Sequence, residues 1–316
     1  ARRQIDLDAP ITDYLPWFSV PSNFEPIRVR HLLNHTGGLV GAIDRSPDIR
    51  GSVYALRETA AVTAPGTVFS YSDAGYQILT LILERVVGQP FAEIIRQQIF
   101  TALGMHHSHA TITSAIRPQM ATGYRSLYDD RPLHSSHPLV PVTWFEVRSG
   151  DCSIISTAED MAKFARMLLT EGKSADAEIL AVADWQVLMS AQIDGGWCKY
   201  GYGTMRRSYK GTVYNGHGGG MPGYIAEMLL DLDTGIGVVV LCTEPYLRQL
   251  SMQTAHLWRS AYLGNPISPE EWTIPELTDV PNAAEYAGNY RSDDDSFELR
   301  AEGTSLSLVY QTGSVL

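Results

Sequence analysis

Four segments between Tyr200 and Thr243 alternate apolar and polar residues with a period of two, and this feature restricts the fold most strongly. The segments are 200–205, 212–215, 224–231 and 236–243. Such alternation is typical of β-strands, and the Asp/Gly-rich stretch at 231–237 predicts a hairpin turn between the last two. Strands with such short connections pair antiparallel, so the sequence predicts an antiparallel sheet.

Helical periodicity dominates the residues that precede this sheet. Apolar residues recur at helical spacing in Tyr76–Val87 and again in Phe91–Leu103. Gly88 and Gly104 follow these segments and are expected to end the two helices. The two segments therefore predict a helical pair.

Three further helices are predicted from shorter signals. Ile27–Leu33 runs into a Gly-Gly pair, which can end a helix. Ser156–Glu159 has the spacing of a capping box, with Ser156 as the cap. A last helix is expected at about 246–262. The fold class is therefore α/β (α+β), with helices packed on an antiparallel sheet.

Composition excludes some classes of partner. The 316 residues carry a formal net charge of −11, from 24 basic and 35 acidic residues. No run of Lys and Arg forms a basic stripe, so nucleic acid is not expected as a partner. The longest apolar runs, such as Ile236–Cys242, are too short to be a membrane segment. No signal peptide opens the sequence, which leaves localisation unknown.

The three cysteines, Cys152, Cys198 and Cys242, lie at unrelated spacings. So sparse and odd a set argues against a disulfide framework and a zinc ribbon, and it predicts buried small side chains. A Cys-His nucleophile pair that uses Cys152 is a weaker alternative.

The stretch Asn215–Tyr224, "NGHGGGMPGY", has four interpretations: a phosphate cradle, a metal site, a tight turn or one wall of an active site. A phosphate loop needs a helix after the glycines, and here a strand is expected. His106, His107 and His109 also suggest a metal, but no carboxylate or Cys accompanies them, so a solvated loop is expected. No metal and no cofactor are therefore expected.

Three segments in order, Arg30–Leu39, Ala64–Met105 and Tyr214–Cys242, resemble the serine β-lactamase-like hydrolases. The branch concerned holds class C β-lactamases, D-Ala-D-Ala carboxypeptidases, D-aminopeptidases and related esterases. The resemblance covers about residues 1–262. It implies a β-lactamase/transpeptidase-like fold with a helical subdomain. It also implies an enzyme that cleaves an amide or ester through an acyl-enzyme.

The resemblance also implies roles for particular residues. Tyr71-Ser72-Asp73 matches the family's Tyr-x-Asn loop, which makes Tyr71 the group that takes and returns a proton and Asp73 a substrate contact. An ionised Asp in place of Asn only accepts hydrogen bonds. It would repel a substrate carboxylate and favour an amine or a neutral ester, or it would mark lost activity. His35 is expected to be structural, a hydrogen-bonded imidazole at a helix end.

His217-Gly218-Gly219 matches the family's Lys-Thr-Gly or His-x-Gly strand motif. The resemblance implies that His217 hydrogen-bonds Tyr71 or a substrate carboxylate, and that Gly218 and Gly219 admit the substrate. By position, the N–H of Gly220 completes the oxyanion hole.

The sequence departs from the family because it contains no Ser-x-x-Lys. Thr170–Lys173 has the spacing but is expected at a helix end, as a surface turn. The nucleophile is therefore expected upstream of Ala1. The alternative is a catalytically inactive member that binds peptidoglycan-like or peptide ligands.

The predicted domains are residues 1–263, the hydrolase domain, and 284–316, the beginning of a C-terminal antiparallel β domain that resembles lipocalin-like tails. The segment 264–283 is rich in proline and is expected to link them. The expected partners are a small-molecule or peptide substrate and, as a possibility left open, further copies of the chain.

Overall fold

The computed structural model describes residues 4–42, 48–128, 137–143, 148–152, 154–174, 177–243, 248–265, 280–291 and 296–310. The chain forms two compact units. Unit 1 comprises 1–120, 144–219 and 227–241, and unit 2 comprises 121–143, 220–226 and 242–316. No helix in the described ranges is long and apolar enough to cross a membrane.

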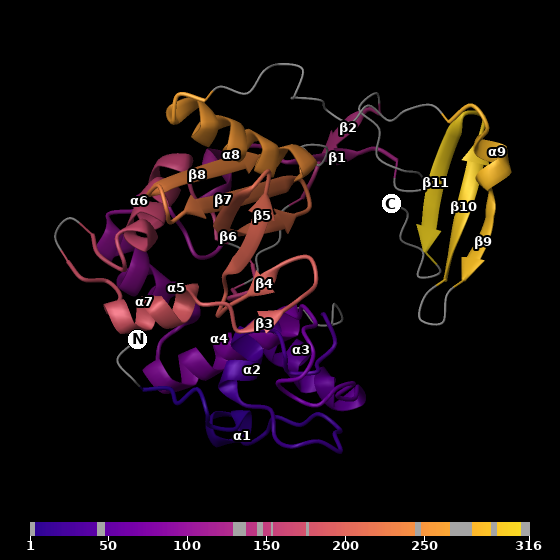
Figure 1. Cartoon of the computed structure of the whole chain (residues 1–316). Coiled ribbons are helices and arrows are strands. Elements are labelled where there is room, and N and C mark those ends of the chain that lie inside the picture. Colours follow the sequence, from indigo (N-terminus) through magenta and orange to yellow (C-terminus); the bar gives the residue numbers. More distant parts are fainter. Residues whose placement is uncertain are drawn as a thin grey trace. The chain divides into compact units, whose positions relative to one another are not determined.

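The first helices of unit 1 surround α4, which is Asp73–Val87 (Figure 1). The other three helices are α1 (Ile11–Tyr14), α2 (Val29–Leu33) and α3 (Ile49–Ala55), and each contacts α4. Their shared core is fully apolar and includes Leu32, Val53, Leu56, Ile78 and Ile82. Burial of this core, about 25 cal/mol for each Å² of apolar surface, holds the short helices in place.

The expected helix at Tyr76–Val87 is confirmed, but it begins three residues earlier, at Asp73. Ser72 is the N-cap, and its hydroxyl oxygen accepts a hydrogen bond from the Gly75 amide at 3.2 Å. Ser72 is a favoured cap residue because it satisfies one of the free amides of the first turn. The cap fixes the backbone directly after Tyr71.

The second helical group of unit 1 contains α5 (Phe91–Ile95), α6 (Ala158–Leu169) and α7 (Val182–Met189). The helix expected at 91–103 is confirmed, but its middle widens into a π-helical segment at Arg96–Thr101. Unit 1 also has two short 3₁₀-helices, η1 (Leu56–Glu58) and η3 (Arg117–Gln119).

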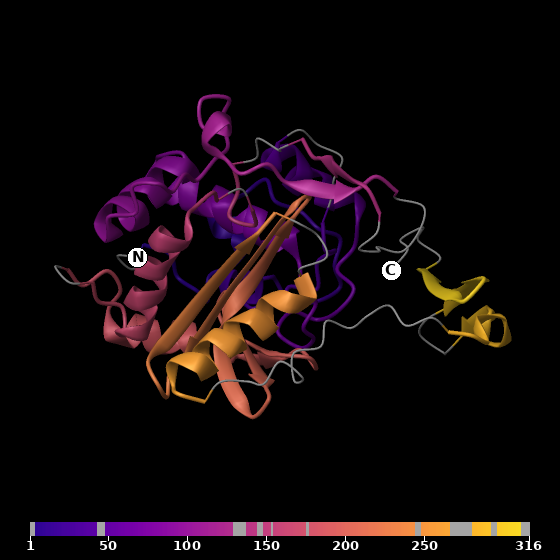
Figure 2. The same cartoon turned by 90° about the horizontal axis from the view of Figure 1, so that it is seen from above.

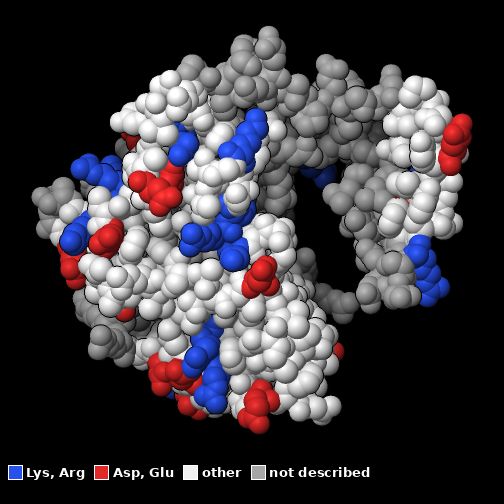
Figure 3. Space-filling model, in the orientation of Figure 1, with Lys and Arg blue, Asp and Glu red and all other residues white. Residues whose placement is uncertain are grey.

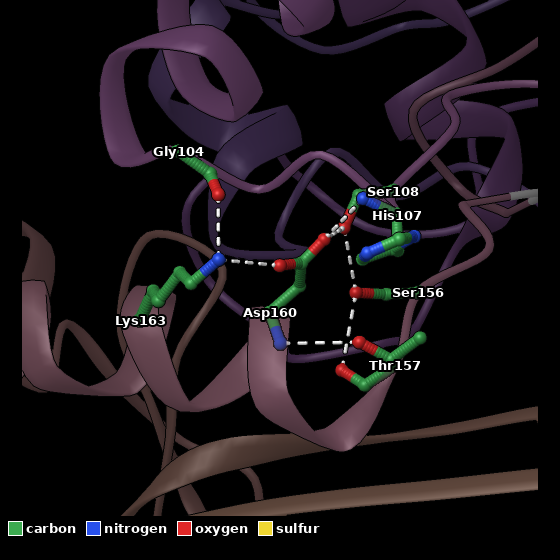
Figure 4. Close-up of polar contacts among 7 residues, drawn as sticks. All are labelled: Gly104, His107, Ser108, Ser156, Thr157, Asp160 and Lys163. Carbon is green, nitrogen blue, oxygen red and sulfur yellow. Dashed lines mark hydrogen bonds and ion pairs between the residues drawn. The ribbon is translucent and has the colours of Figure 1, made fainter.

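The capping box predicted at Ser156–Glu159 is wrong by one residue. Thr157 caps α6, and its hydroxyl accepts from the Asp160 amide at 3.2 Å. The hydroxyl of Ser156 lies 2.8 Å from that of Ser108 instead (Figure 4). A β-branched Thr with the same hydroxyl is an equally plausible cap, so the local pattern did not distinguish the two.

Asp160 ties α6 to the segment that follows the α5 helix (Figure 4). Its fully buried carboxylate accepts hydrogen bonds from the His107 amide at 2.7 Å, the Ser108 hydroxyl at 2.9 Å and Lys163 at 2.8 Å. Burial acts to raise the pKa of Asp160, but these three donors outweigh it and hold the pKa below its ordinary value. His107 thus has a structural role through its backbone.

The sheet contains six strands in the order β3-β4-β5-β6-β7-β8, side by side in both views (Figures 1 and 2). Their bounds are β3 Ile193–Asp194, β4 Lys199–Tyr200, β5 Met205–Tyr209, β6 Thr212–Met221, β7 Tyr224–Asp231 and β8 Ile236–Cys242. The pairs from β3 to β6 are antiparallel. The predicted meander is confirmed.

Two strand predictions need correction. The segment 200–205 is not one strand, because a turn closed by the Gly201 amide on the Thr204 carbonyl at 2.7 Å separates β4 from β5. The strand expected at 212–215 continues to Met221, so the glycines of "NGHGGGM" lie inside β6, and the expected strand at 224–231 follows them as β7. Glycine has no side chain to alternate, so periodicity gave no signal there.

Unit 2 contains the hairpin of β1 (Tyr124–Ser126) and β2 (Leu139–Pro141) and the helices α8 (Arg248–Tyr262) and α9 (Ala283–Tyr286). It also contains an antiparallel sheet in the order β11-β10-β9. These strands are β9 Gly288–Arg291, β10 Ser296–Glu302 and β11 Ser305–Tyr310. Strands were expected in this part of the chain. Most of the expected linker, 266–279, lies outside the described residues.

On the face of the molecule drawn in Figure 3, basic and acidic side chains are interspersed among uncharged surface.

Gly216 allows β6 to lie against β7. Its φ is +151°, and an added Cβ would lie 1.9 Å from the carbonyl oxygen of Met228. We expect Gly216→Ala to lower the free energy of unfolding by about 3 kcal/mol or more, because neither backbone can yield. Urea denaturation measures the loss.

Gly235→Ala is the matched control. Gly235 has a φ of +70°, but no atom lies within 4 Å of an added Cβ. It should therefore cost about 1–2 kcal/mol, the penalty of the left-handed backbone alone. Equal losses in the two variants would contradict the close approach at Gly216.

Candidate active site

Five aromatic rings from separate segments of unit 1 meet in one cluster, which we call the His-Tyr cluster: His35, Tyr71, Tyr76, Tyr200 and His217. The ring of His35 stacks on Tyr71 at 4.1 Å between centroids and on Tyr76 at 5.1 Å. Tyr200 meets His35 edge-on at 4.8 Å and His217 at 5.8 Å. The ring centroids of Tyr71 and His217, the two residues that the sequence predicted to share a site, lie 6.1 Å apart.

Each ring of the cluster lies at or near the end of a helix or within a strand, which fixes its backbone. His35 follows α2, and Tyr71 precedes the cap of α4. Tyr200 ends β4 and His217 lies within β6. His35 has a φ of +55°, an uncommon conformation for a residue other than glycine that costs about 1 kcal/mol or more. Such a cost is retained where the surrounding contacts demand that conformation.

Hydrogen bonds connect the buried members of the cluster. The Tyr200 hydroxyl lies 3.1 Å from Nε2 of His35 and 3.0 Å from Nε2 of His217. The Ser72 amide donates to Nδ1 of His35 at 3.0 Å. Nδ1 of His217 contacts the carbonyl oxygen of Gly218. Both ring nitrogens of His217 are thus used inside the protein, and neither is bonded to Tyr71.

The sequence identified the hydrogen-bonded imidazole at His35 but not its partner. Tyr200 appeared in the sequence only as part of a Tyr-Gly-Tyr-Gly stretch. Its side chain is 1% exposed, and it lies at a strand end where a Tyr with a buried hydroxyl needs a polar partner. No local pattern indicates that this partner lies far away in the sequence.

Burial keeps both imidazoles of the cluster neutral. Desolvation, followed by the electrostatic interaction with the neighbouring His217 ring, lowers the pKa of His35 to about 3, although the Ser72 hydrogen bond partly opposes this. Desolvation also lowers the pKa of His217, and the charge of Arg207 acts in the same direction. Burial raises the pKa values of Tyr76 and Tyr200. The buried layer of the cluster is therefore uncharged at neutral pH.

Tyr71 is the accessible tyrosine of the cluster, with 42% of its surface exposed. Partial burial, followed by the carboxylates of Asp73 and Asp151, raises its pKa to about 12. Asp73 is the first residue of α4, and Asp151 accepts a hydrogen bond from the Gln77 amide at 3.1 Å. Two negative charges therefore act on the Tyr71 hydroxyl.

Gly218, Gly219 and Gly220 lie near the end of β6. Gly219 and Gly220 are exposed, and Gly218 is half-buried. The β5–β6 ladder ends where Met205 pairs with Gly216. The glycines therefore lie beyond the part of β6 that β5 covers, and their backbone edge on that side is outside this ladder.

The remaining candidates from the sequence lie elsewhere. His109 pairs through its backbone with Ile155, at 2.9 Å in both directions. In the described parts of the chain, no three His, Cys, Asp or Glu residues are grouped so as to hold a metal. Cys152 is half-buried and not fully buried as expected. Thr170 is the C-cap of α6, so the segment that follows is a helix end as expected.

A model of the Beta-lactamase family matches residues 1–262. The chain belongs to the Beta-lactamase family. Its helices and antiparallel sheet, with α4 preceded by Tyr-Ser-Asp and β6 carrying His-Gly-Gly, agree with the fold and the motif order that the sequence predicted.

Two curated relatives of this Beta-lactamase family chain are similar over most of its length. Penicillin-binding protein 4 of Amycolatopsis lactamdurans is 28% identical over 75% of the chain, and the D-aminopeptidase of Gluconobacter oxydans is 25% identical over 85%. The matches span 65% and 50% of the lengths of these relatives. The chain therefore corresponds to only part of each relative.

Among solved structures, the octameric penicillin-binding protein homologue of Pyrococcus abyssi has the same fold, with a TM-score of 0.71 and 23% identity. The match covers 98% of this chain and 71% of the other.

The buried His35 predicts how stability depends on pH. Its folded pKa of about 3 lies below its ordinary value of 6.5, so between these values the unfolded chain binds more protons. The stability contributed by neutral His35 is complete above pH 6.5 and is lost as the pH falls toward 3, at up to ~1.4 kcal/mol for each pKa unit.

We expect His35→Gln to reduce the loss of unfolding free energy between neutral and mildly acidic pH, because Gln does not titrate. Urea denaturation at a series of pH values measures this slope. His106→Gln, at an exposed histidine, is the control and should keep the wild-type slope. An unchanged slope in His35→Gln would contradict the burial of a neutral imidazole.

Proposed function

We propose that the chain carries the proton-transfer and strand-wall side of a serine hydrolase site that cleaves amides or esters through an acyl-enzyme. The observation that supports this most directly is that Tyr71 and His217 lie in the same cluster, with 6.1 Å between their ring centroids. Membership of the Beta-lactamase family over residues 1–262 supports the reaction class.

In this proposal the nucleophile is the serine of a Ser-x-x-Lys that is not among the 316 residues. Its hydroxyl oxygen attacks the carbonyl carbon, and its proton passes through Tyr71 to the leaving amine or alcohol as the C–N or C–O bond breaks. Water then releases the acyl group by the reverse proton path. A pKa of about 12 makes Tyr71 a poor base at neutral pH unless a cation lies beside it. The lysine of the motif would supply that charge.

Gly218 and Gly219 would admit the substrate backbone to the strand wall, and the amide of Gly220 would donate to the oxyanion. Their position beyond the β5–β6 ladder supports this, because peptide groups outside that ladder remain available to a substrate. One oxyanion donor contributes about 3–4 kcal/mol to transition-state stabilisation.

Two observations favour substrates with a free amino group. The carboxylates of Asp73 and Asp151 both act on the Tyr71 hydroxyl. An ammonium group has a positive charge and three donors, and would be attracted by both carboxylates. The D-aminopeptidase among the relatives is consistent with such a substrate.

Two further features of the molecule remain predictions. The strands β9–β11 are proposed to open a C-terminal β domain that resembles lipocalin-like tails. Self-association is proposed by analogy with the octameric homologue, and size-exclusion chromatography with light scattering would test it.

We expect Tyr71→Phe to lower kcat for ester or D-peptide hydrolysis by about 100-fold or more, because proton transfer contributes this much. The measurement uses the full-length gene product, with Tyr262→Phe as the control because Tyr262 is 81% exposed. An unchanged kcat in Tyr71→Phe would remove Tyr71 from the reaction.

Intact-mass analysis after treatment with a fluorophosphonate detects the covalent modification, and peptide mapping of the same protein locates the nucleophile. Modification of the Ser-x-x-Lys serine supports the proposal. Modification of a residue among the 316, including Cys152, would overturn it. No modification and no hydrolysis would favour the inactive, ligand-binding alternative.

The substrate preference is tested by Asp73→Asn. We expect the ratio of kcat/KM for substrates with a free amino group to their N-acetylated forms to fall about tenfold, equivalent to ~1.4 kcal/mol. Glu159→Gln, an exposed acid in the first turn of α6, is the matched control. A ratio that stays constant in Asp73→Asn would contradict recognition of an ammonium group by this carboxylate.

A further inference from the structure

The groups at the two ends of the His-Tyr cluster have fixed hydrogen-bonding roles, and they restrict where its hydrogens can lie. At one end lies the Ser72 amide, which can only donate, 3.0 Å from Nδ1 of His35. At the other end lies the carbonyl oxygen of Gly218, which can only accept, beside Nδ1 of His217. Between these ends lie two imidazoles and the Tyr200 hydroxyl, each of which can pass on one hydrogen.

From the Ser72 end, the arrangement follows step by step. Nδ1 of His35 accepts, so a neutral His35 carries its hydrogen on Nε2 and donates to the Tyr200 oxygen at 3.1 Å. The Tyr200 oxygen then accepts from His35, and its own hydrogen can point to Nε2 of His217 at 3.0 Å or to the Tyr76 hydroxyl. The first of these places the hydrogen of His217 on Nδ1, because Nε2 then accepts.

From the Gly218 end, the same arrangement results independently. A contact between Nδ1 of His217 and a carbonyl oxygen is a hydrogen bond only if Nδ1 carries the hydrogen. Nε2 of His217 then accepts, and its donor is the Tyr200 hydroxyl. Agreement of the two ends excludes the reverse order. In that order the Ser72 N–H would face another N–H, and the Gly218 carbonyl oxygen would face a nitrogen lone pair. The lowered pKa values of both imidazoles keep them neutral, and the hydrogen-bond partners select the tautomer.

We propose that His35 and Tyr200 are positioning residues, which align the Gly218 carbonyl through one directed chain of hydrogen bonds from the Ser72 amide. The chain is useful because it ends in a run of glycines, which no side chains restrain. Fixing the carbonyl of Gly218 fixes the peptide plane that it shares with the Gly219 amide. The role of that plane in binding substrate rests on the proposed function, but the order of the hydrogens does not.

The direct test is the tautomer of each histidine, read from long-range ¹H–¹⁵N spectra of the full chain at neutral pH. The His35→Gln and His217→Gln variants assign the two signals. We expect His35 as the Nε2–H form and His217 as the Nδ1–H form. Either histidine in the opposite tautomer, or His217 as the cation, would overturn the proposal.

Tyr200→Phe tests the middle of the chain, because it removes the hydroxyl and keeps the ring. We expect the ¹⁵N signal of Nε2 in His217 to move toward that of an acceptor without a donor, while Nδ1 of His35 stays unchanged. Tyr214→Phe is the control, since Tyr214 is also a 1% exposed tyrosine of the sheet. A His217 signal that responds equally to both variants would contradict a bond from Tyr200.

The activity of the full-length protein separates this inference from the proposed function. If the proposed series of hydrogen bonds aligns the Gly218 carbonyl, Tyr200→Phe should lower kcat roughly tenfold with little change in KM. The reason is that a misaligned β6 backbone affects the transition state more than substrate binding. If the protein hydrolyses nothing, the proposed function fails, but the histidine tautomers still test the proposed order of hydrogen bonds. If Tyr200→Phe retains full kcat, the positioning role fails although the hydrolase proposal stands.

Discussion

The hydroxyl of Tyr200 is a point at which the helical part and the sheet of unit 1 are joined by polar contacts. It is buried, and a buried hydroxyl without partners costs about 1–3 kcal/mol. It avoids this cost by contacting His35, from the loop after α2, and His217, from β6. The position of the loop and the position of the strand are therefore set by the same oxygen atom. A shift of either element would remove one of the partners of that atom.

This constraint divides the cluster into two layers with different chemistry. The buried His35 and Tyr200 and the half-buried His217 form a neutral layer whose hydrogen-bonding groups contact one another. Tyr71 stacks on His35 and forms the exposed layer, where the carboxylates of Asp73 and Asp151 act on its hydroxyl. The layer of His35, Tyr200 and His217 fixes the positions of the rings, and the exposed layer has Tyr71, the group that can exchange a proton. A rigid support beneath a reactive side chain is what a preorganised site requires.

The sequence predicted elements whose signals are local and missed those that depend on distant partners. Period-two alternation located β7 and β8, and helical spacing located α4, since each pattern reports burial of one face. The glycines of β6 carry no such pattern, so the length of that strand was missed. The sequence brought Tyr71 and His217 into one site through motif order. It could not pair Tyr200 with His35, because 165 residues separate them and neither neighbourhood specifies the other.

The environment of His217 also explains why a histidine at this strand position differs from a lysine. A lysine there would place a permanent positive charge beside Tyr71, but His217 is held neutral, and its Nε2 is bonded to Tyr200. The charges that remain near Tyr71 are negative. In the proposed reaction, the cation that makes Tyr71 a usable base must therefore come from the lysine of the nucleophile motif or from the substrate. A substrate ammonium near Asp73 would then both bind the site and help to activate it, which connects specificity and rate through a single electrostatic field.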